Sequence, residues 1–338
     1  MSKATIGDVA KAAGVSKKTV SRVFNDESGV KQATKDKVLQ KIAELGYMPN
    51  LNARRLRTNQ SYLIGVLYVD YPGNFYSNLI TSGAIEACDE LGYDLLIRPF
   101  SLDNKHKDSI IRHMIDRSNI DGFIVIPPLC DDQEVLASLA ATNVPIVRIA
   151  PLEHEEENCI HSDEIGATKQ AINHLLSLGH TRIGFINYLV GHAAGAWRYE
   201  GYKQALAEAG IREEQELIQQ HVYAENILEQ ACRRMLSQPN PPTAIFTVND
   251  AAAAVLYRVA TQLHKRIPYD LSVVGFDDDP LAVNLWPPLT TVRQPVQALG
   301  KAAANLLIKQ LIQGKPNEIK PELLCQLVIR NSCGPVVF

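Results

Sequence analysis

Residues 5–25 read TIGDVAKAAGVSKKTVSRVFN, and this stretch decides how the first part of the chain folds. Thr5 is a favourable N-cap, because its hydroxyl can accept a hydrogen bond from a free amide of the first helical turn. Apolar residues recur at helical spacing over 6–12, and Gly14 then allows the tight turn of a helix-turn-helix. Ser16 can cap a second helix. The stretch therefore predicts two short helices joined by a glycine turn.

The second predicted helix, Thr19–Phe24, has an apolar side and a polar side. Val20 and Val23 face inward in this prediction. The outer face carries hydrogen-bond donors, which are Lys17, Lys18, Ser21 and Arg22. A third helix is expected at 33–45 and ends at Gly46. A short helix with donors on its outside fits the major groove of DNA, where base edges can be read.

A basic head precedes an acidic body. Residues 1–60 contain 12 Lys and Arg against 5 Asp and Glu, a net charge of +7, whereas the remaining residues contain 22 against 32 and carry −10. A basic segment binds nucleic acid by releasing counterions from the phosphates. Charge alone would equally fit a small solvated helical domain. The order of cap, glycine turn and basic helix favours DNA binding.

Residues 5–25, followed by PNLNARRLR at 49–57, closely resemble the start of the LacI/GalR family of bacterial transcription regulators. The resemblance implies a hinge helix over 50–57 that forms on the operator, with Leu56 wedged into the minor groove. A wedge between base steps kinks DNA; an ordinary linker leucine is the alternative. The positions that the resemblance assigns to DNA binding are Thr5, Ser16, Lys17, Lys18, Thr19, Ser21, Arg22, Asn25, Asn50, Ala53, Arg54, Leu56 and Arg57.

The remainder of the 338-residue chain alternates strands and helices, beginning with the apolar run LIGVLYV at 63–69. This alternation predicts parallel sheets with right-handed crossovers. The strands are too many for one compact sheet, so we expect two Rossmann-like parallel-sheet subdomains. The family resemblance implies the same periplasmic-binding-protein-like body. A helix at 296–313 and a strand at 324–329 are expected to complete one subdomain each.

The sequence predicts an all-α head and an α/β body with a linker between them. The predicted boundaries are 1–48 for the helix-turn-helix domain, 49–61 for the hinge helix and linker, and 62–338 for the effector-binding and dimerisation domain, which divides into an N-subdomain at about 62–160 plus 293–322 and a C-subdomain at about 161–290 plus 323–338.

Ligands bind beyond the carboxyl ends of strands in such sheets, facing a cleft between the subdomains. This rule selects Asp70, which follows the first strand. The resemblance assigns effector contacts to Arg198, Asn249 and Asp277. Further positions that often touch effectors in the family are Tyr76, His161, Tyr223 and Gln294.

Other roles remain open for several of these residues. Asp277, like Asp250, could cap a helix, since aspartate is a favoured cap. Arg198 could form a structural salt bridge across the cleft, His161 could be a core or hinge histidine, and Tyr223 could simply pack.

The segments GHAAGAWRYEGY (191–202), RIAP (148–151) and WPPLTTVRQP (286–295) look like a subgroup of the family that regulates glucoside or amino-sugar use. Aromatic faces together with Asp, Asn and Arg suit a polyol, because these groups exchange hydrogen bonds with hydroxyls. We therefore expect a sugar or sugar-like effector. The loop YPGNFYSNL (71–79) departs from the Asn-Pro-Phe-Tyr found in many relatives.

An enzyme is the main rival class, since α/β sheets host many enzymes. The sequence has no GxGxxG after the first strand, no Walker A motif and no GxSxG elbow. His154 stands among Glu155–Glu157 but lacks the spacing of a helical metal motif. The six cysteines form no CxxC pair and read as buried thiols. We expect no cofactor, no metal and no enzymatic activity.

These features lead to one interpretation, a cytoplasmic, homodimeric repressor that binds a near-palindromic double-stranded DNA operator. A sugar-like effector would release it. No apolar run is long enough for a membrane span, and no leucine heptads follow residue 330. Three alternatives stay open: a corepressor-dependent regulator, a regulator gated by a protein partner, and a sugar-binding protein without a DNA role.

Overall fold

The chain divides into two compact units in the computed structural model. They comprise Met1–Ser61, here called the head, and Tyr62–Phe338, here called the body. The structure describes residues 4–24, 29–47, 60–70, 75–101, 106–153, 157–188, 193–221, 225–314 and 323–336.

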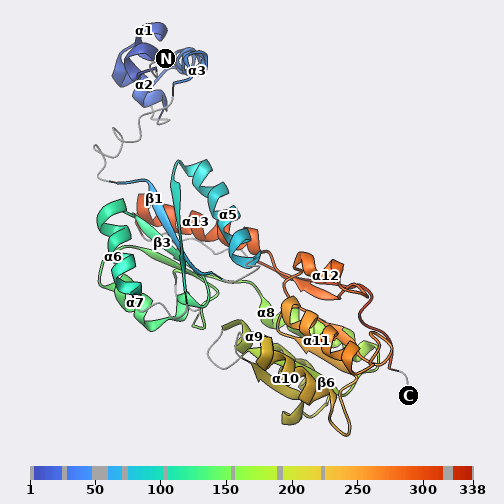
Figure 1. Ribbon diagram of the computed structural model, residues 1–338. Helices are drawn as coiled ribbons and strands as arrows, with labels where there is room; N and C mark the ends of the chain where they lie inside the picture. The colour runs from blue at the N-terminus through green and yellow to red at the C-terminus, as the bar shows by residue number, and fades with distance from the viewer. Residues whose placement is uncertain are drawn as a thin grey trace. The chain divides into compact units, whose positions relative to one another are not determined.

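The head contains the helices α1 (Ile6–Ala13), α2 (Lys17–Phe24) and α3 (Gln32–Leu45) (Figure 1). Their bounds lie within two residues of the predicted ones. Val9 of α1, Val20 of α2 and Val38 of α3 are fully buried in a common core. A helix this short gains most of its stability from such packing, so the apolar spacing in the sequence is what holds the head together.

Caps fix the start and the end of α1. The Thr5 hydroxyl accepts from the backbone N–H of Asp8, and the Asp8 carboxylate accepts in return from the backbone N–H of Thr5 at 2.8 Å. Gly14 ends the helix at a φ of 67°, in the left-handed region that glycine adopts without a steric penalty. The chain can therefore turn into α2 within a few residues.

The first part of the body is a five-stranded parallel sheet in the order β2-β1-β3-β4-β5. Its strands are β1 (Leu63–Val69), β2 (Asp94–Phe100), β3 (Gly122–Val125), β4 (Ile146–Ile149) and β5 (Cys159–Ile160). Its helices are α5 (Phe75–Leu91), α6 (Lys107–Ser118), α7 (Gln133–Ala140) and α13 (Val296–Gln313). We call this sheet with its helices the N-half.

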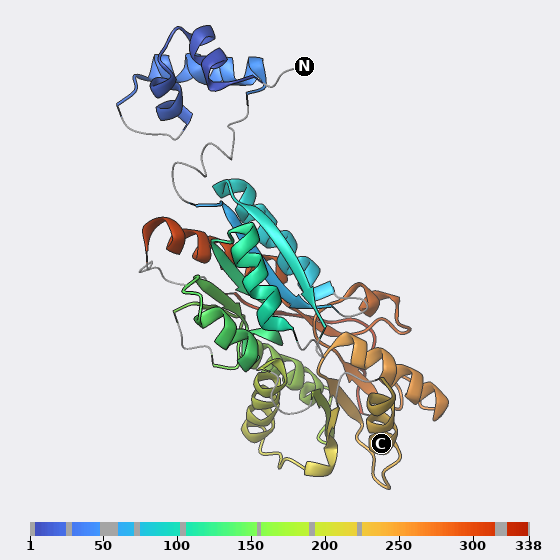
Figure 2. The ribbon, with the colours of Figure 1, turned by 60° about the vertical axis from the view of Figure 1, so that its left-hand side comes forward.

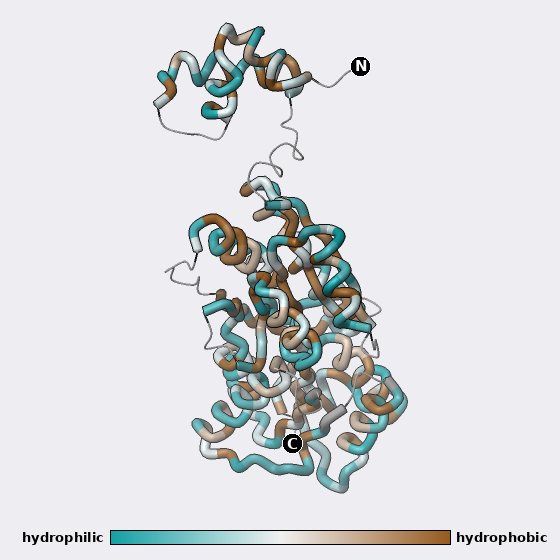
Figure 3. Tube along the Cα trace, turned by 90° about the vertical axis from the view of Figure 1, so that its left-hand side faces the viewer, coloured by the Kyte–Doolittle hydropathy of each residue, from teal (hydrophilic) through white to brown (hydrophobic). Residues whose placement is uncertain are grey.

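Successive residues of β1 point to opposite faces of the sheet and into two separate cores. Ile64 and Val66 belong to the core that includes α5 and α13, whereas Leu67 and Val69 belong to the core of α6 and α7. Figure 1 shows these helix pairs on opposite sides of the sheet. The hydropathy colouring of Figure 3 shows hydrophobic segments running through the body.

The helices α5 and α13 come from distant parts of the sequence yet pack at very short range (Figure 2). A Cβ atom on Gly83 would lie 1.9 Å from the Gln297 carbonyl oxygen, and one on Gly300 would lie 2.0 Å from the Ile80 carbonyl oxygen. Only glycine fits at either position.

The second part of the body, here called the C-half, is a four-stranded parallel sheet in the order β7-β6-β8-β9. Its strands are β6 (Ile183–Tyr188), β7 (Ile218–His221), β8 (Ala244–Thr247) and β9 (Ser272–Val274). Its helices are α8 (Glu164–Ser177), α9 (Ala193–Glu208), α10 (Glu225–Leu236), α11 (Asp250–Gln262) and α12 (Pro280–Asn284). Stacked rings of Phe185 and Phe246, 5.1 Å apart, lie in its core.

The last strand differs from the prediction. Residues 324–329 were expected to complete a subdomain sheet, but β11 (Gln326–Val328) pairs antiparallel with β10 (Thr291–Arg293) in a sheet of two strands. Beside β9, the β10 segment is joined to the C-half by two isolated parallel bridges, between Val274 and Thr290 and between Asp277 and Arg293. At the point where the chain passes between the halves, the short antiparallel ribbon of β10 and β11 therefore takes the place of a further parallel strand along the edge of the C-half sheet.

Among the residues that the structure describes, no helix combines the length and the apolar character needed to cross a membrane.

Candidate functional site

The polar side of α2 is the candidate DNA-reading surface of the head. Ser16 caps this helix, since its Oγ accepts the backbone N–H of Thr19 at 3.1 Å. The predicted contact residues lie on one face: Lys17, Lys18 and Arg22 are exposed, and Thr19 and Ser21 are half-buried. The opposite face is buried in the head core. The helix thus presents cations and hydroxyls outward, as a major-groove helix requires.

Seven predicted site residues lie outside the described residues. They are Asn25, Asn50, Ala53, Arg54, Leu56 and Arg57 of the DNA-binding set and Tyr223 of the effector set. Their roles stay predictions.

Arg198 on α9 is the centre of a buried polar cluster in the body. Its side chain is nearly inaccessible, and its Nε donates to Glu164 Oε2 at 2.8 Å. Its Nη1 donates to the carbonyl oxygen of Val248, and its Nη2 lies 3.7 Å from Asp277 Oδ1. The guanidinium carbon lies 3.7 Å from the ring centroid of Phe276. All three guanidinium nitrogens therefore lie near an acceptor, and one face of the group lies against an aromatic ring.

Asp277 follows β9 and faces this arginine. The carboxylate accepts a hydrogen bond from Gln294 Nε2 at 2.7 Å. Burial raises the pKa of Asp277 to about 6, although the nearby Arg198 charge lowers it. Gln294 Oε1 is buried without a hydrogen-bond partner in the described part of the chain. We call Glu164, Arg198, Phe276, Asp277 and Gln294 the Arg198 cluster.

The residues that cap α11 and α12 are not the two aspartates that the sequence suggested as possible caps. The cap of α11 is Asn249, whose side chain accepts from the backbone N–H of Ala252 at 2.8 Å. The cap of α12 is Asp279, so neither Asp277 nor Asp250 caps a helix. Asn249, predicted as an effector contact, thus has a structural role.

Asp250 lies fully buried behind the Arg198 cluster. Its carboxylate accepts from the Thr291 hydroxyl at 2.6 Å and from the Asp279 backbone N–H at 2.8 Å. Burial raises the pKa of Asp250 to about 8, and the charge of Asp277 raises it further. The hydrogen bond to Thr291 joins α11 of the C-half to β10 near the passage to the N-half.

The other predicted effector residues differ in their surroundings. Tyr76, near the start of α5, has a pKa raised well above its ordinary value by burial and then by the charges of Glu164 and Asp277, so it lies beside the cluster. The His161 ring makes an edge contact with Trp197 at 5.8 Å. Asp70 is exposed at the end of β1, and its backbone N–H donates to the Phe100 carbonyl oxygen.

Sequence reasoning missed Glu164, which forms the closest ion pair of the cluster. The only sequence signal was an acidic residue opening a helix just after the predicted site residue His161. An acidic residue at this position is common in the first turn of a helix, where its charge interacts favourably with the helix dipole. The structure brings together Tyr76, Arg198, Asp277 and Gln294 around Glu164.

The cluster is suited to hydroxyl groups. The Asp277 carboxylate and the unpartnered Gln294 Oε1 can accept hydrogen bonds from a ligand. The described residues contain no group of three or more His, Cys, Asp or Glu side chains that could hold a metal ion.

Comparisons with known proteins follow this division of the chain. The family described as bacterial regulatory proteins, lacI family, matches residues 5–50, and the periplasmic binding protein-like domain matches residues 172–333. The chain is 33% identical to the HTH-type transcriptional regulator DegA of Bacillus subtilis (strain 168), with 99% of each chain covered. It belongs to the LacI family.

Other proteins that are similar to this LacI-family chain support the family assignment. The ribose operon repressor of Escherichia coli (strain K12) is 32% identical over 97% of the chain and 99% of the relative. The structure titled transcriptional regulator CelR–cellobiose complex superposes with a TM-score of 0.74 at 27% identity, covering 97% and 99% of the two chains. The lac repressor dimer bound to operator and the anti-inducer ONPF gives 0.73 at 29% identity, covering 98% and 100%.

The comparisons confirm the predicted fold, a helix-turn-helix head on a periplasmic-binding-protein-like body. The LacI-family chain is a DNA-binding transcriptional regulator, and the relatives are regulators rather than enzymes. The finer assignment to glucoside or amino-sugar regulators stays a prediction.

Proposed function

We propose that this LacI-family protein is a homodimeric, cytoplasmic repressor of sugar-utilisation genes, released from its operator by a sugar-like inducer. The observation that carries the proposal is that one chain has both an exposed polar face on α2 and the buried Arg198 cluster, which can accept hydrogen bonds from hydroxyl groups. The ribose operon repressor and the CelR–cellobiose complex among the similar proteins support a sugar.

DNA recognition follows from the head. Two heads of a dimer read the half-sites of a near-palindrome, with Lys18 and Arg22 at base edges. The hinge over 50–57 forms on the operator, and Leu56 opens its central step. The similarity to the lac repressor dimer bound to operator supports this arrangement.

Effector control follows from the body. Tyr76 belongs to the N-half, whereas Arg198 and Asp277 belong to the C-half, so a ligand at the Arg198 cluster contacts both halves. A ligand changes operator affinity only through a preference for one arrangement of the halves. We propose that the inducer prefers the arrangement in which the hinges cannot form together.

The charges of the cluster favour a neutral polyol over an anion. Arg198 already contacts two carboxylates, those of Glu164 and Asp277, which outnumber its single positive charge. An anionic effector would meet these carboxylates without a free cation from the described members of the cluster. Hydroxyl groups, in contrast, donate to Asp277 and to Gln294 Oε1.

The alternatives are separable by experiment. A sugar-binding protein without a DNA role is disfavoured by the match of residues 5–50 to regulatory proteins. A corepressor would bind at the same cluster but strengthen operator binding. A partner-gated regulator would give no response to any sugar.

A thermal-shift screen of the full chain against pentoses, disaccharides, glucosides, amino sugars, sugar phosphates and purines tests the proposal. A ligand at about 100 times its dissociation constant stabilises the native state by about 2.7 kcal/mol. We expect a neutral sugar to raise Tm and to weaken operator binding. A sugar that strengthens operator binding would identify a corepressor, and the absence of any sugar response would contradict the proposal.

A further inference from the structure

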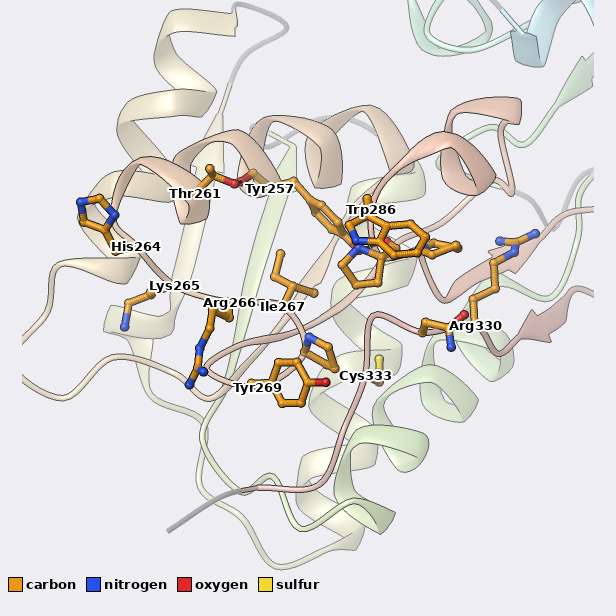
Figure 4. A pocket seen from close by; sticks show the side chains of 14 residues that line it. Tyr257, Thr261, His264, Lys265, Arg266, Ile267, Tyr269, Trp286, Arg330 and Cys333 are labelled. Carbon is orange, nitrogen blue, oxygen red and sulfur yellow. Dashed lines mark hydrogen bonds between the residues drawn. The ribbon is translucent and has the colours of Figure 1, made fainter.

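A groove with a volume of about 880 Å³ lies in the C-half, lined by fourteen residues (Figure 4). Four segments form it: the end of α11, the connection from α11 to β9, the loop after α12 and the residues after β11. No member of the Arg198 cluster lines it. The volume falls in the range of about 300–1,000 Å³ that small-molecule sites occupy.

Aromatic rings dominate the walls of the groove. Trp286 is 88% exposed and Tyr269 is 68% exposed, which is unusual for large rings in the absence of a partner. Tyr257 is buried and donates its hydroxyl to the Pro287 carbonyl oxygen at 3.0 Å, which fixes that wall. Figure 4 shows Ile267 between Trp286 and Tyr269. Exposed ring faces beside an apolar floor suit a flat ligand.

The groove is cationic on an acidic body. Its lining includes Lys265, Arg266 and Arg330 but no Asp or Glu, although residues 61–338 carry 32 acidic against 22 basic side chains. Figure 4 shows Lys265 and Arg266 at one end and Arg330 at the other.

Two of these cations already form ion pairs with carboxylates that do not line the groove. Arg266 Nε binds Asp270 Oδ2 at 2.8 Å, and Arg330 Nη2 binds Asp278 Oδ1 at 2.6 Å. The charge of Lys265 also acts on Asp270, so at this end of the groove one carboxylate faces two cations. One positive charge is therefore left for an occupant, and anions are repelled by most of the surrounding surface.

We propose that this groove is a second ligand site, distinct from the Arg198 cluster, that takes a small aromatic or heteroaromatic anion. The ring stacks on the exposed faces of Trp286 and Tyr269, and the anionic group pairs with Lys265. Arg266 lies 5.6 Å from the Tyr269 ring centroid and supports that ring by a cation–π contact.

The test uses two fluorescent probes with one ring framework, the anion 1-anilinonaphthalene-8-sulfonate and its neutral counterpart N-phenyl-1-naphthylamine. Each is titrated against the full chain, and binding is read from the rise in the probe's own emission on direct excitation, which does not depend on Trp286. We expect one site for the anionic probe per chain. Lys265→Ala should weaken the anionic probe about threefold and leave the neutral probe unchanged.

Trp286→Ala should weaken both probes about tenfold, because stacking and apolar burial are lost together. Matched controls are Lys203→Ala, which removes an exposed lysine of α9, and Ile312→Ala, which removes an exposed apolar side chain of α13. Both controls should bind the probes as the unaltered chain does. Equal binding of the two probes, or probe binding that is insensitive to Trp286→Ala, would overturn the proposal.

A second copy of the chain is the competing occupant. Sedimentation velocity of the same variants separates the two cases. If Trp286→Ala shifts a dimer to a monomer, and the unaltered dimer excludes both probes, the groove is an interface between copies and the proposal fails. A variant that keeps its oligomeric state and loses the anionic probe supports the ligand site.

Discussion

At the scale of single residues, the body concentrates carboxylates where burial opposes their charge. Asp250 and Asp277 lie next to each other in space. Burial raises the pKa of both carboxyl groups, and the charge of Asp277 raises the pKa of Asp250 further. Their hydrogen bonds to Thr291 and Gln294 connect the C-half with the segment that leads to α13. The protonation of these residues therefore bears on stability as well as on ligand binding.

Asp250→Asn should change how stability depends on pH. The folded-state pKa of Asp250 is about 8, above its ordinary value of 3.8, so the native state holds a proton that the unfolded chain releases. That contribution is fully present below about pH 4 and is lost as the pH rises through 8. The difference in unfolding free energy between variant and unaltered chain should increase with pH by up to about 1.4 kcal/mol per unit.

Urea unfolding at pH 5, 6, 7 and 8 measures this difference. Asp270→Asn is a matched control, because Arg266 holds the pKa of Asp270 well below its ordinary value and no proton is gained on folding in this range. A flat difference for Asp250→Asn across the range would show that its carboxyl is ionised in the native state.

Arg198→Ala should remove the effector response and also destabilise the body. The change leaves the buried Glu164 carboxylate without its cation, and breaking a buried pair from one side costs about 3–5 kcal/mol. The double variant Arg198→Ala, Glu164→Gln should recover part of this loss. Denaturant unfolding of the single and double variants measures the coupling. Additive losses would contradict a direct interaction between the two side chains.

At the scale of elements, each short helix depends on its caps and on one buried face. For α2 the cap is Ser16 and the buried face includes Val20, which leaves the polar side outward. The long helices α5 and α13 depend instead on their close approach at two glycines.

Lys18→Ala should relax base preference at one position of each half-site, with a loss of about 1–3 kcal/mol against the preferred base. Selection from random duplexes, followed by titration of single-base operator variants, measures the effect. The control is Lys41→Ala, which removes an α3 lysine already paired with Glu44 at 2.5 Å. Equal weakening on every sequence would identify Lys18 as a phosphate contact.

Gly300→Ala should destabilise the N-half by about 1–3 kcal/mol, because the added Cβ meets the rigid backbone of α5 rather than a movable side chain. Gly7→Ala is the matched control in α1, where the added Cβ meets the flexible end of Lys17 at 3.3 Å and the Thr5 hydroxyl oxygen at 3.4 Å, and helix propensity improves. Thermal unfolding of both variants compares them. A Gly300→Ala chain as stable as the original would show that α5 and α13 can separate without cost.

At the scale of the whole molecule, periodicity and caps predicted the helices of the head and most strands of the body. The ribbon of β10 and β11 was not predictable, because a three-residue strand gives no periodic signal and its pairing depends on where the chain passes between the halves. The pairing of Arg198 with Asp277 joined two residues that the family resemblance suggested. Glu164 was not predicted as a site residue, because the sequence cannot show which of the acidic residues at helix starts is buried.

The late position of α13 also governs how the chain can be made. The N-half begins at residue 62, but one face of its sheet is covered only in part, by α5, until residues 296–313 have been synthesised. A ribosome therefore exposes an incomplete apolar sheet throughout the synthesis of the C-half, and such surfaces favour aggregation. We expect nascent chains that stop before residue 296 to need a chaperone, and a split of the gene within the C-half to fail unless both fragments are produced together.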